Sequence, residues 1–249
     1  MRSLMDRKRL DQIPRGNTCP GVNRLIIERL LSAFPEDKVY KLLDVPCGGG
    51  EFLDAVKDFF PAAITFGADN ADPSTSFSHA FLRSDAAGGS AIQSEEKFDV
   101  ITCISGVMEF DNTLSFFRRL RSVADSGAIL FVTNDNLVSV RDRFLYLLFG
   151  RLRQYRLAIP PGAPTWKILP LQNLMRILID ADFEILRIEY VSPKPSDWIW
   201  SPLAALVFAF QYAYTKFGET RFASTPTTQM FPFNSLLSRH YVVKCKVRP

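Results

Sequence analysis

The segment KLLDVPCGGGEF, residues 41–52, constrains the fold of this chain more than any other. An apolar run ends in Asp44, three glycines follow at positions 48–50, and Glu51 opens a helix-like pattern. Glycine permits tight turns with positive φ, which other residues adopt rarely. The pattern predicts a buried strand, a tight loop and a helix, with a carboxylate on either side of the loop.

Strand-like and helix-like segments alternate along the rest of the chain. After an early helix over residues 22–34, apolar runs predict further strands and amphipathic runs predict helices. The predicted strands are 40–45, 63–69, 97–105, 127–134, 183–190 and 240–247, and the predicted helices are 51–59, 113–124, 137–149 and 171–181. Such alternation indicates crossover connections, and therefore an α/β fold with a mostly parallel sheet covered on both faces.

The composition is that of an ordinary globular protein. With 249 residues, 47% of them hydrophobic and 22% charged, the chain can bury a substantial core, and we expect one domain over 1–249. Within it we expect an N-terminal helical cap over 1–38 and lid or insertion segments over 150–170 and 192–235. The first of these segments is rich in proline and has no clear period.

Charge and cysteine content argue against several classes of protein. The net charge of +4 is modest and the basic residues are spread out, so we expect no nucleic-acid partner. The four cysteines are far apart and lack ligand spacing to His79 or His240, which favours structural or exposed histidines and predicts neither a disulfide framework nor a metal site. The N-terminus has no apolar signal-peptide core, and we expect a cytoplasmic protein.

The glycine loop favours a ligand with positive charge. A phosphate-binding P-loop would have Lys and Ser or Thr after its glycines, where Glu51 and Phe52 stand. A dinucleotide fingerprint would have a small residue in place of Leu53, and the carboxylates of Asp44 and Glu51 would repel a pyrophosphate. S-adenosylmethionine, with its sulfonium and ammonium groups, is the cofactor that we expect.

At these residues the chain resembles the class I S-adenosylmethionine-dependent methyltransferases, of the bacterial, type 11-like kind. LLDVPCGGGEF is similar to the first motif of that family, an acid two residues before a GCGxG-type loop. Six further segments resemble its later motifs in the same order: ITFGADNADPS, RSDAAGG, KFDVITCISGVMEF, LRSVADSGAILFVTNDN, LMRILIDADFEILRIEY and SRHYVVKCKV. The resemblance implies a Rossmann-like fold whose seven-stranded, mostly parallel sheet has an antiparallel last strand.

The resemblance also implies which residues form the cofactor site. Asp69 lies where an acid binds ribose hydroxyls, and Asp85 and Ala86 lie where the family contacts adenine. Pro46 replaces the usual glycine, which removes an N–H but leaves a carbonyl that can accept from the ligand's ammonium group. The full predicted set is Asp44, Pro46, Cys47, Gly48, Asp69, Asn70, Asp85, Ala86 and Ser105.

Methyl transfer from a sulfonium depends mainly on placing the acceptor in line with the methyl group. A hydroxyl acceptor also needs a base. The sequence offers Glu109, after the fourth predicted strand of the family pattern, and Asp135, after the fifth. Phe110 stands where the family often has histidine after the glutamate. We expect O-methylation of a small molecule, a lipid or a glycan precursor.

An apolar segment over 198–217 predicts a helix near the C-terminus. Ser201 is its predicted N-cap, and apolar residues lie nearly all round it, so it has to be buried somewhere. Packing within its own domain, a homodimer interface, a lid over the substrate and peripheral membrane contact stay open.

Other functions of such a fold also stay open. A catalytically altered protein would bind S-adenosylmethionine, or act as a membrane-associated scaffold, without transferring methyl groups. A dinucleotide oxidoreductase would bind NADH instead.

Overall fold

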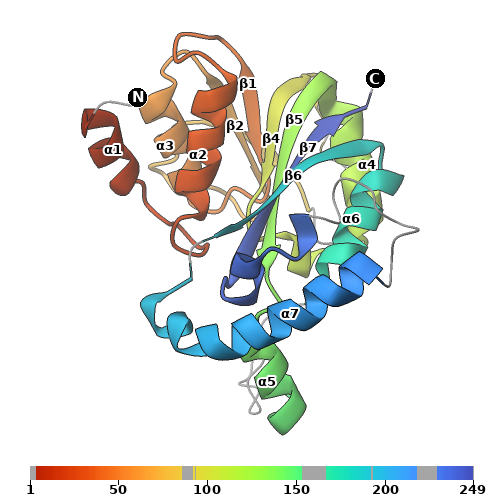
Figure 1. Ribbon diagram of the computed structural model, residues 1–249. Helices are drawn as coiled ribbons and strands as arrows, with labels where there is room; N and C mark the ends of the chain where they lie inside the picture. The colour runs from red at the N-terminus through yellow and green to blue at the C-terminus, as the bar shows by residue number, and fades with distance from the viewer. Residues whose placement is uncertain are drawn as a thin grey trace.

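The computed structural model describes residues 4–85, 92, 94–152, 167–191, 193–217 and 229–248. Its centre is a seven-stranded sheet in the order β3-β2-β1-β4-β5-β7-β6 (Figure 1). The strands are β1 (Lys41–Asp44), β2 (Ile64–Asp69), β3 (Ala80–Arg83), β4 (Phe98–Cys103), β5 (Ala124–Asp135), β6 (Phe183–Val191) and β7 (His240–Val247). The first five strands pair in parallel, and β7 runs antiparallel to both β5 and β6. This confirms the predicted Rossmann-like fold.

Helices cover both faces of the sheet (Figure 1). One face carries α1 (Leu4–Asp11), α2 (Val22–Ala33) and α3 (Glu51–Phe59), and the other carries α4 (Thr113–Val123) and α6 (Leu171–Asp180). Successive residues of a strand point to opposite faces. Leu42 therefore joins the core with α2 and α3, and Leu43 joins the core with α4 and α6.

The elements predicted from periodicity are all present, with shifted ends. Strand β5 starts at Ala124, three residues earlier than predicted, and α5 (Val140–Phe149) starts three residues later. Strand β3 was not predicted from periodicity, because its four residues at the edge of the sheet include no buried position. The predicted cap over 1–38 contains α1 and α2, and the predicted segments 150–170 and 192–235 lie partly outside the described residues.

The apolar helix α7 (Ser201–Phe217) forms as predicted but without an N-cap at Ser201. The 3-10 helix η2 (Pro195–Trp200) leads directly into it, and Ser201 already has helical dihedrals. Asp197 fixes this junction to the start of β7: the Nε of Arg239 donates to its carboxylate at 2.6 Å, and Asp197 is buried. This contact connects the start of β7 to η2 and α7, the elements that follow β6.

Helix α7 is largely exposed in the single chain, so its apolar side chains are not buried against the described part of its own domain. Ala204 is its one buried residue, while Phe210 and Phe217 are 71% and 77% exposed. One side of the helix packs against α5 and the 3-10 helix η4 (Phe233–Leu236) in a small apolar core. None of the described helices is long and apolar enough to cross a membrane.

Candidate active site

A cleft of about 770 Å³ lies at the C-terminal edge of the sheet, where β1, β2, β4 and β5 end. Residues 15–20, between α1 and α2, line it from the N-terminal side. The hydroxyl groups of Thr18 and Ser105 are 2.7 Å apart and hold this segment to the loop after β4. The predicted cofactor residues that line the cleft are Asp44, Pro46, Cys47, Gly48, Asp69, Asn70 and Ser105.

Asp44 places a carboxyl group at the bottom of this cleft with little access to water. It is only 2% exposed, and its Oδ1 accepts a 2.6 Å hydrogen bond from the Thr102 hydroxyl. Burial raises the pKa of Asp44 to about 7; the Thr102 hydrogen bond opposes this rise, and the nearby Asp69 and Glu51 add to it. A buried carboxyl group among other acids favours a cationic partner.

The glycine loop brings β1 and β2 together. The backbone N–H of Gly48 donates to Asp69 Oδ2 at 3.0 Å, and the other oxygen of Asp69 accepts from the Asn70 N–H at 2.8 Å. Gly48 and Gly50 have φ of 51° and 90°, in the region that favours glycine. Burial raises the pKa of Cys47 to about 12, so this thiol stays protonated and is not a nucleophile.

The loop after β4 approaches the glycine loop very closely. A Cβ added to Gly106 would lie 2.3 Å from Cδ of Pro46, which only glycine avoids. Ser105 has a φ of 56°, which is uncommon for a residue with a side chain. Its N–H donates to the Thr133 hydroxyl at 2.9 Å, so the ends of β4 and β5 are also linked.

The structure places Asp85, one of the two predicted adenine contacts, outside the lining of the cleft. Asp85 is exposed and does not line the cleft, whereas its neighbour Ser84 does and is buried. Ala86 lies outside the described residues. Of the predicted cofactor residues that the structure describes, all except Asp85 line the cleft.

The two predicted bases lie at the other end of the cleft. Glu109, in the 3-10 helix η1 (Val107–Glu109), is exposed to solvent, and Asp135 ends β5. Asp135 is the register partner of His240, the first residue of β7, and its Oδ1 lies 3.3 Å from His240 Nδ1. Burial lowers the pKa of His240, but Asp135 and the nearby Cys19 together outweigh it, so the pKa is raised.

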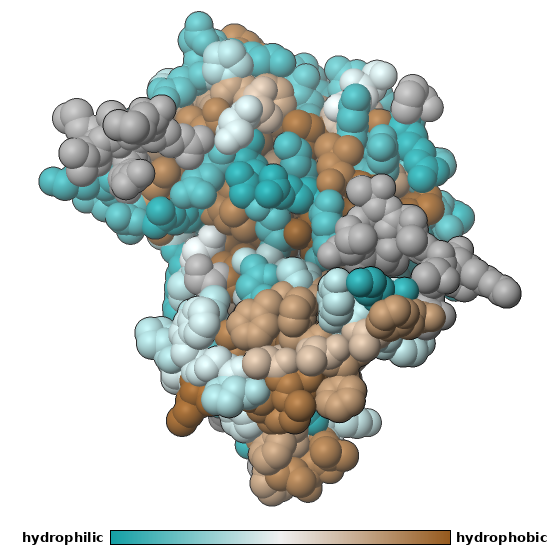
Figure 2. Space-filling model, viewed as in Figure 1, coloured by the Kyte–Doolittle hydropathy of each residue, from teal (hydrophilic) through white to brown (hydrophobic). Residues whose placement is uncertain are grey.

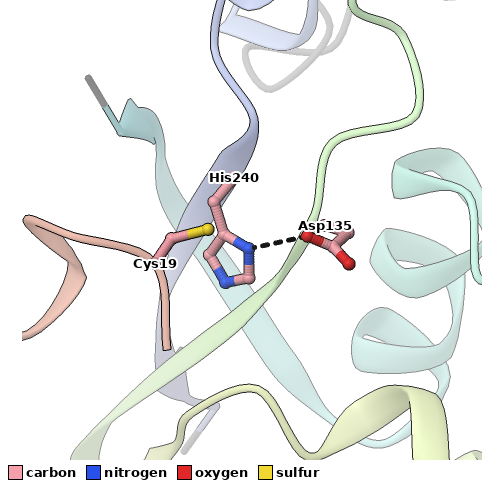
Figure 3. A group of neighbouring side chains, drawn as sticks. All are labelled: Cys19, Asp135 and His240. Atoms are coloured by element: carbon pink, nitrogen blue, oxygen red, sulfur yellow. Dashed lines mark hydrogen bonds and ion pairs between the residues drawn. The ribbon is translucent and has the colours of Figure 1, made fainter. Parts of the chain in front are cut away.

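Cys19, Asp135 and His240 form a cluster that the sequence did not indicate (Figure 3). Their ligand atoms lie within 4.8 Å of one another, a set of donor types that divalent metals accept. All three line the cleft. His240 was expected to be structural or exposed; the structure buries it and places it in the lining of the cleft. No local signal could have revealed it, since the pairing of β5 with β7 brings these residues together.

Comparisons with known proteins agree with this geometry. A family model described as "Methyltransferase domain" matches residues 20–188, more than half of the chain. A search of curated proteins finds no match.

Three solved structures illustrate the likeness of the fold. A mycolic acid cyclopropane synthase complexed with SAH is 14% identical, with a TM-score of 0.57 over 97% of this chain and 94% of that one. Magnesium protoporphyrin IX methyltransferase from Synechocystis PCC 6803, with bound SAH, is 12% identical, with a TM-score of 0.55 over 98% and 95%. An S-adenosylmethionine-dependent methyltransferase from Mesorhizobium loti is 13% identical, with a TM-score of 0.52 over 88% and 96%.

The sheet order, the glycine loop and the family match lead to one conclusion, and the cofactor expected from the charges of that loop agrees with it. The chain belongs to the class I methyltransferases that use S-adenosylmethionine as methyl donor.

Proposed function

We propose that this methyltransferase methylates a hydroxyl group of an amphiphilic acceptor, a lipid or a lipid-linked glycan precursor, at a membrane surface. The observation that carries the proposal is the position of the large apolar surface: α5 and α7 leave the same edge of the sheet that holds the cleft. An acceptor with an apolar anchor would then lie beside its methyl donor.

The cofactor would occupy the end of the cleft formed by β1 and β2. Asp44 and the Pro46 carbonyl would receive the ammonium group, and Asp69 would bind the ribose hydroxyls, as in dinucleotide folds. Cys47, Gly48 and Asn70 line the cleft beside them, and Ser105 lines it from the loop after β4. Asp85 and Ala86 are retained as proposed adenine contacts on the resemblance alone. This division leaves the β4, β5 and β7 end for the acceptor.

That acceptor end is suited to an oxygen nucleophile. A hydroxyl has to lose its proton as the new bond forms, and a positioned base accelerates such a step by about 10²–10⁴-fold. Glu109, Asp135 and His240 all line this end of the cleft.

The apolar surface formed by α5, η2 and α7 has the character of a membrane contact (Figure 2). Its exposed residues include Tyr146, Leu147, Leu148, Phe149, Trp198, Ile199, Phe210, Tyr212, Tyr214 and Phe217. Monomeric proteins rarely expose so many large apolar side chains together, and aromatic residues with Lys216 nearby suit a lipid interface. Helices α6 and α7 also border a second cavity of about 840 Å³ with mostly apolar walls.

Methyl-labelled S-adenosylmethionine tests the reaction. The protein is incubated with it and with lipid, polar-glycan and protein fractions of a cell extract, and the labelled product is analysed for an O-methyl group. We expect label in the lipid fraction. Label confined to the protein fraction, or a methyl group on carbon or sulfur, would refute the proposal.

Vesicle flotation tests the membrane contact. We expect the protein to float with phosphatidylcholine vesicles, and the variant Leu147→Ser/Ile199→Ser, which alters two side chains that are each 80% exposed, to bind at least about tenfold more weakly. The matched control is Val39→Ser, since Val39 is also exposed but precedes β1 at the opposite edge of the sheet. Absence of flotation together with self-association in the ultracentrifuge would assign the surface to a homodimer instead.

A further inference from the structure

We propose that His240 is the base that removes the proton from the acceptor hydroxyl and that Asp135 is the residue that positions it. This inference rests on the proposed O-methylation, because only an acceptor that carries an acidic proton needs such a base. It departs from the expectation that Glu109 or Asp135 acts directly.

The strand pairing gives the first argument. His240 and Asp135 are opposite residues of β7 and β5, so their Cβ atoms lie on the same face of the sheet. A carboxylate only accepts hydrogen bonds, and the 3.3 Å contact with Nδ1 therefore keeps the proton on that nitrogen. Nε2 is left with a free electron pair, as a base requires.

The surroundings of Nε2 give the second argument. His240 is 3% exposed, and its Nε2 is buried and makes no hydrogen bond of ordinary geometry to the described residues, although the Cys19 thiol lies beside the ring. Buried polar atoms of proteins are nearly always hydrogen-bonded. Because His240 also lines the cleft, we infer that the missing partner of Nε2 is the acceptor hydroxyl.

Burial and basicity favour His240 over Glu109 as the base. Glu109 is exposed to solvent, and a carboxylate is ordinarily a weaker base than an imidazole. The imidazolium that forms on His240 is stabilised by the Asp135 carboxylate beside it, in the same way as in serine hydrolase triads.

The reaction then balances without any further reactant. The acceptor oxygen forms a bond to the methyl carbon while the carbon–sulfur bond breaks, and its electron pair stays on sulfur as S-adenosylhomocysteine. The hydroxyl proton passes to Nε2, and His240 releases it to solvent after the product has left.

The test compares His240→Gln with His79→Gln, using the labelled cofactor and the acceptor fraction that the wild-type protein methylates. His79 is the matched control, because its Nε2 also contacts a carboxylate, Asp54, at 3.0 Å, yet it does not line the cleft. We expect His240→Gln to lower kcat by about 10²–10⁴-fold, with unchanged binding of S-adenosylhomocysteine. His79→Gln should transfer methyl groups at the wild-type rate.

The positioning role of Asp135 has its own readout. Asp135→Asn should lower kcat with little change in KM, and it should move the acidic limb of the pH–rate profile to lower pH. The charged and titratable groups around His240 are Asp135 on β5, Cys19 before α2, and Arg239, whose charge is balanced by Asp197 of η2. A profile identical to that of the wild type would overturn the positioning role.

The remaining outcomes separate this inference from the proposed function. If His240→Gln keeps the wild-type rate while Glu109→Gln loses it, the inference is overturned and O-methylation stands. If the wild-type protein forms no O-methyl product, the proposed function fails and the inference fails with it. If dialysis against a chelator abolishes transfer and zinc restores it, the cluster is a metal site and the inference is again overturned.

Discussion

The hydroxyl of Thr102 donates a 2.6 Å hydrogen bond to Asp44, which is its direct partner in the pairing of β1 with β4. Both residues are buried. The bond does not offset the cost of burying a carboxylate, because the pKa of Asp44 is raised to about 7 by burial in the first place and then by Asp69 and Glu51. This pair therefore controls when the cleft carries the charge that a cationic cofactor needs.

Cofactor binding should depend on pH through Asp44. Below its pKa of about 7 the carboxyl is protonated and has to lose a proton before it can pair with the ammonium group. We expect the affinity for S-adenosylhomocysteine to rise by nearly tenfold per pH unit from pH 5 to 7 and to level off above that. Calorimetric titrations across this range check it, and an affinity that is constant from pH 5 to 8 would contradict it.

Replacing Asp44 by Asn should separate stability from binding. A carboxyl whose pKa rises from 3.8 to about 7 on folding destabilises the ligand-free protein as pH increases from about 4 to 7, because the folded state holds the proton more tightly. Asp44→Asn should therefore be more stable at pH 8, by up to about 4 kcal/mol. The amide oxygen still accepts from Thr102.

The same variant should bind the cofactor about 10- to 150-fold more weakly, since a hydrogen bond to a charged group contributes about 1.5–3 kcal/mol. Urea unfolding and calorimetry measure the two effects. Asp72→Asn is the control, because Asp72 is exposed, pairs with Arg83 and does not line the cleft. Equal cofactor affinities of Asp44→Asn and the wild-type protein would refute the assignment of Asp44.

Gly106→Ala should damage both the loop and cofactor binding. The new Cβ would lie 2.3 Å from Pro46 Cδ, and a proline ring has little freedom to move away. We expect a loss of about 1–3 kcal/mol in the free energy of unfolding and at least severalfold weaker binding of S-adenosylhomocysteine.

Gly150→Ala provides the contrast for Gly106. Gly150 has a φ of 62° with nothing within 4 Å of an added Cβ, so the cost there is backbone strain alone, about 1 kcal/mol, and cofactor affinity should not change. If the two variants lose affinity equally, the contact with Pro46 is not the cause.

The ion pair between Asp197 and Arg239 should contribute strongly to stability at neutral pH. The side chains of Asp197 and Arg239 are 4% and 17% exposed, and removing one member of a buried pair costs about 3–5 kcal/mol. We expect Asp197→Asn to lose about 3 kcal/mol in urea unfolding at pH 7. Asp11→Asn, which removes an exposed pair with Arg24, should lose less than about 1 kcal/mol.

Acid should remove this contribution only at low pH. Burial raises the pKa of Asp197, but the opposing effects of Arg239, the Lys194 N–H and Arg141 are larger together. The pKa of Asp197 therefore lies below its ordinary value of 3.8. The stabilisation is thus present above pH 4 and is lost as pH falls through the lowered folded pKa. The difference in unfolding free energy between wild type and Asp197→Asn should be constant from pH 5 to 8, and a difference that shrinks within that range would contradict the argument.

The proposed cofactor end of the cleft could be predicted from the sequence because its signals are local. The apolar run of β1, Asp44 and the glycines of the loop that follows stand within a dozen residues, and a strand-end acid such as Asp69 follows by the same logic. The acceptor end was not predictable in this way. His240 and Asp135 are 105 residues apart, and only the antiparallel pairing of β7 with β5 makes them neighbours.

Exposure of α7 could not be predicted from its composition either. An apolar helix of seventeen residues normally indicates burial, because water disfavours its side chains. The helix instead packs one side on a small core with α5 and η4. Whether other parts of the protein bury such a helix depends on specific tertiary contacts, which hydrophobicity alone does not determine.

The order of the strands has a consequence for how such an enzyme can diversify. The donor is proposed to bind over β1 and β2, encoded in the first third of the chain, while the end of β5, the start of β7, and Lys194 and Arg239 from the segment between β6 and β7 border the opposite end of the cleft. Exchanging residues 193–239 between relatives should retarget methylation and leave the choice of donor untouched. Selection can therefore act on what is modified without risking the ability to modify.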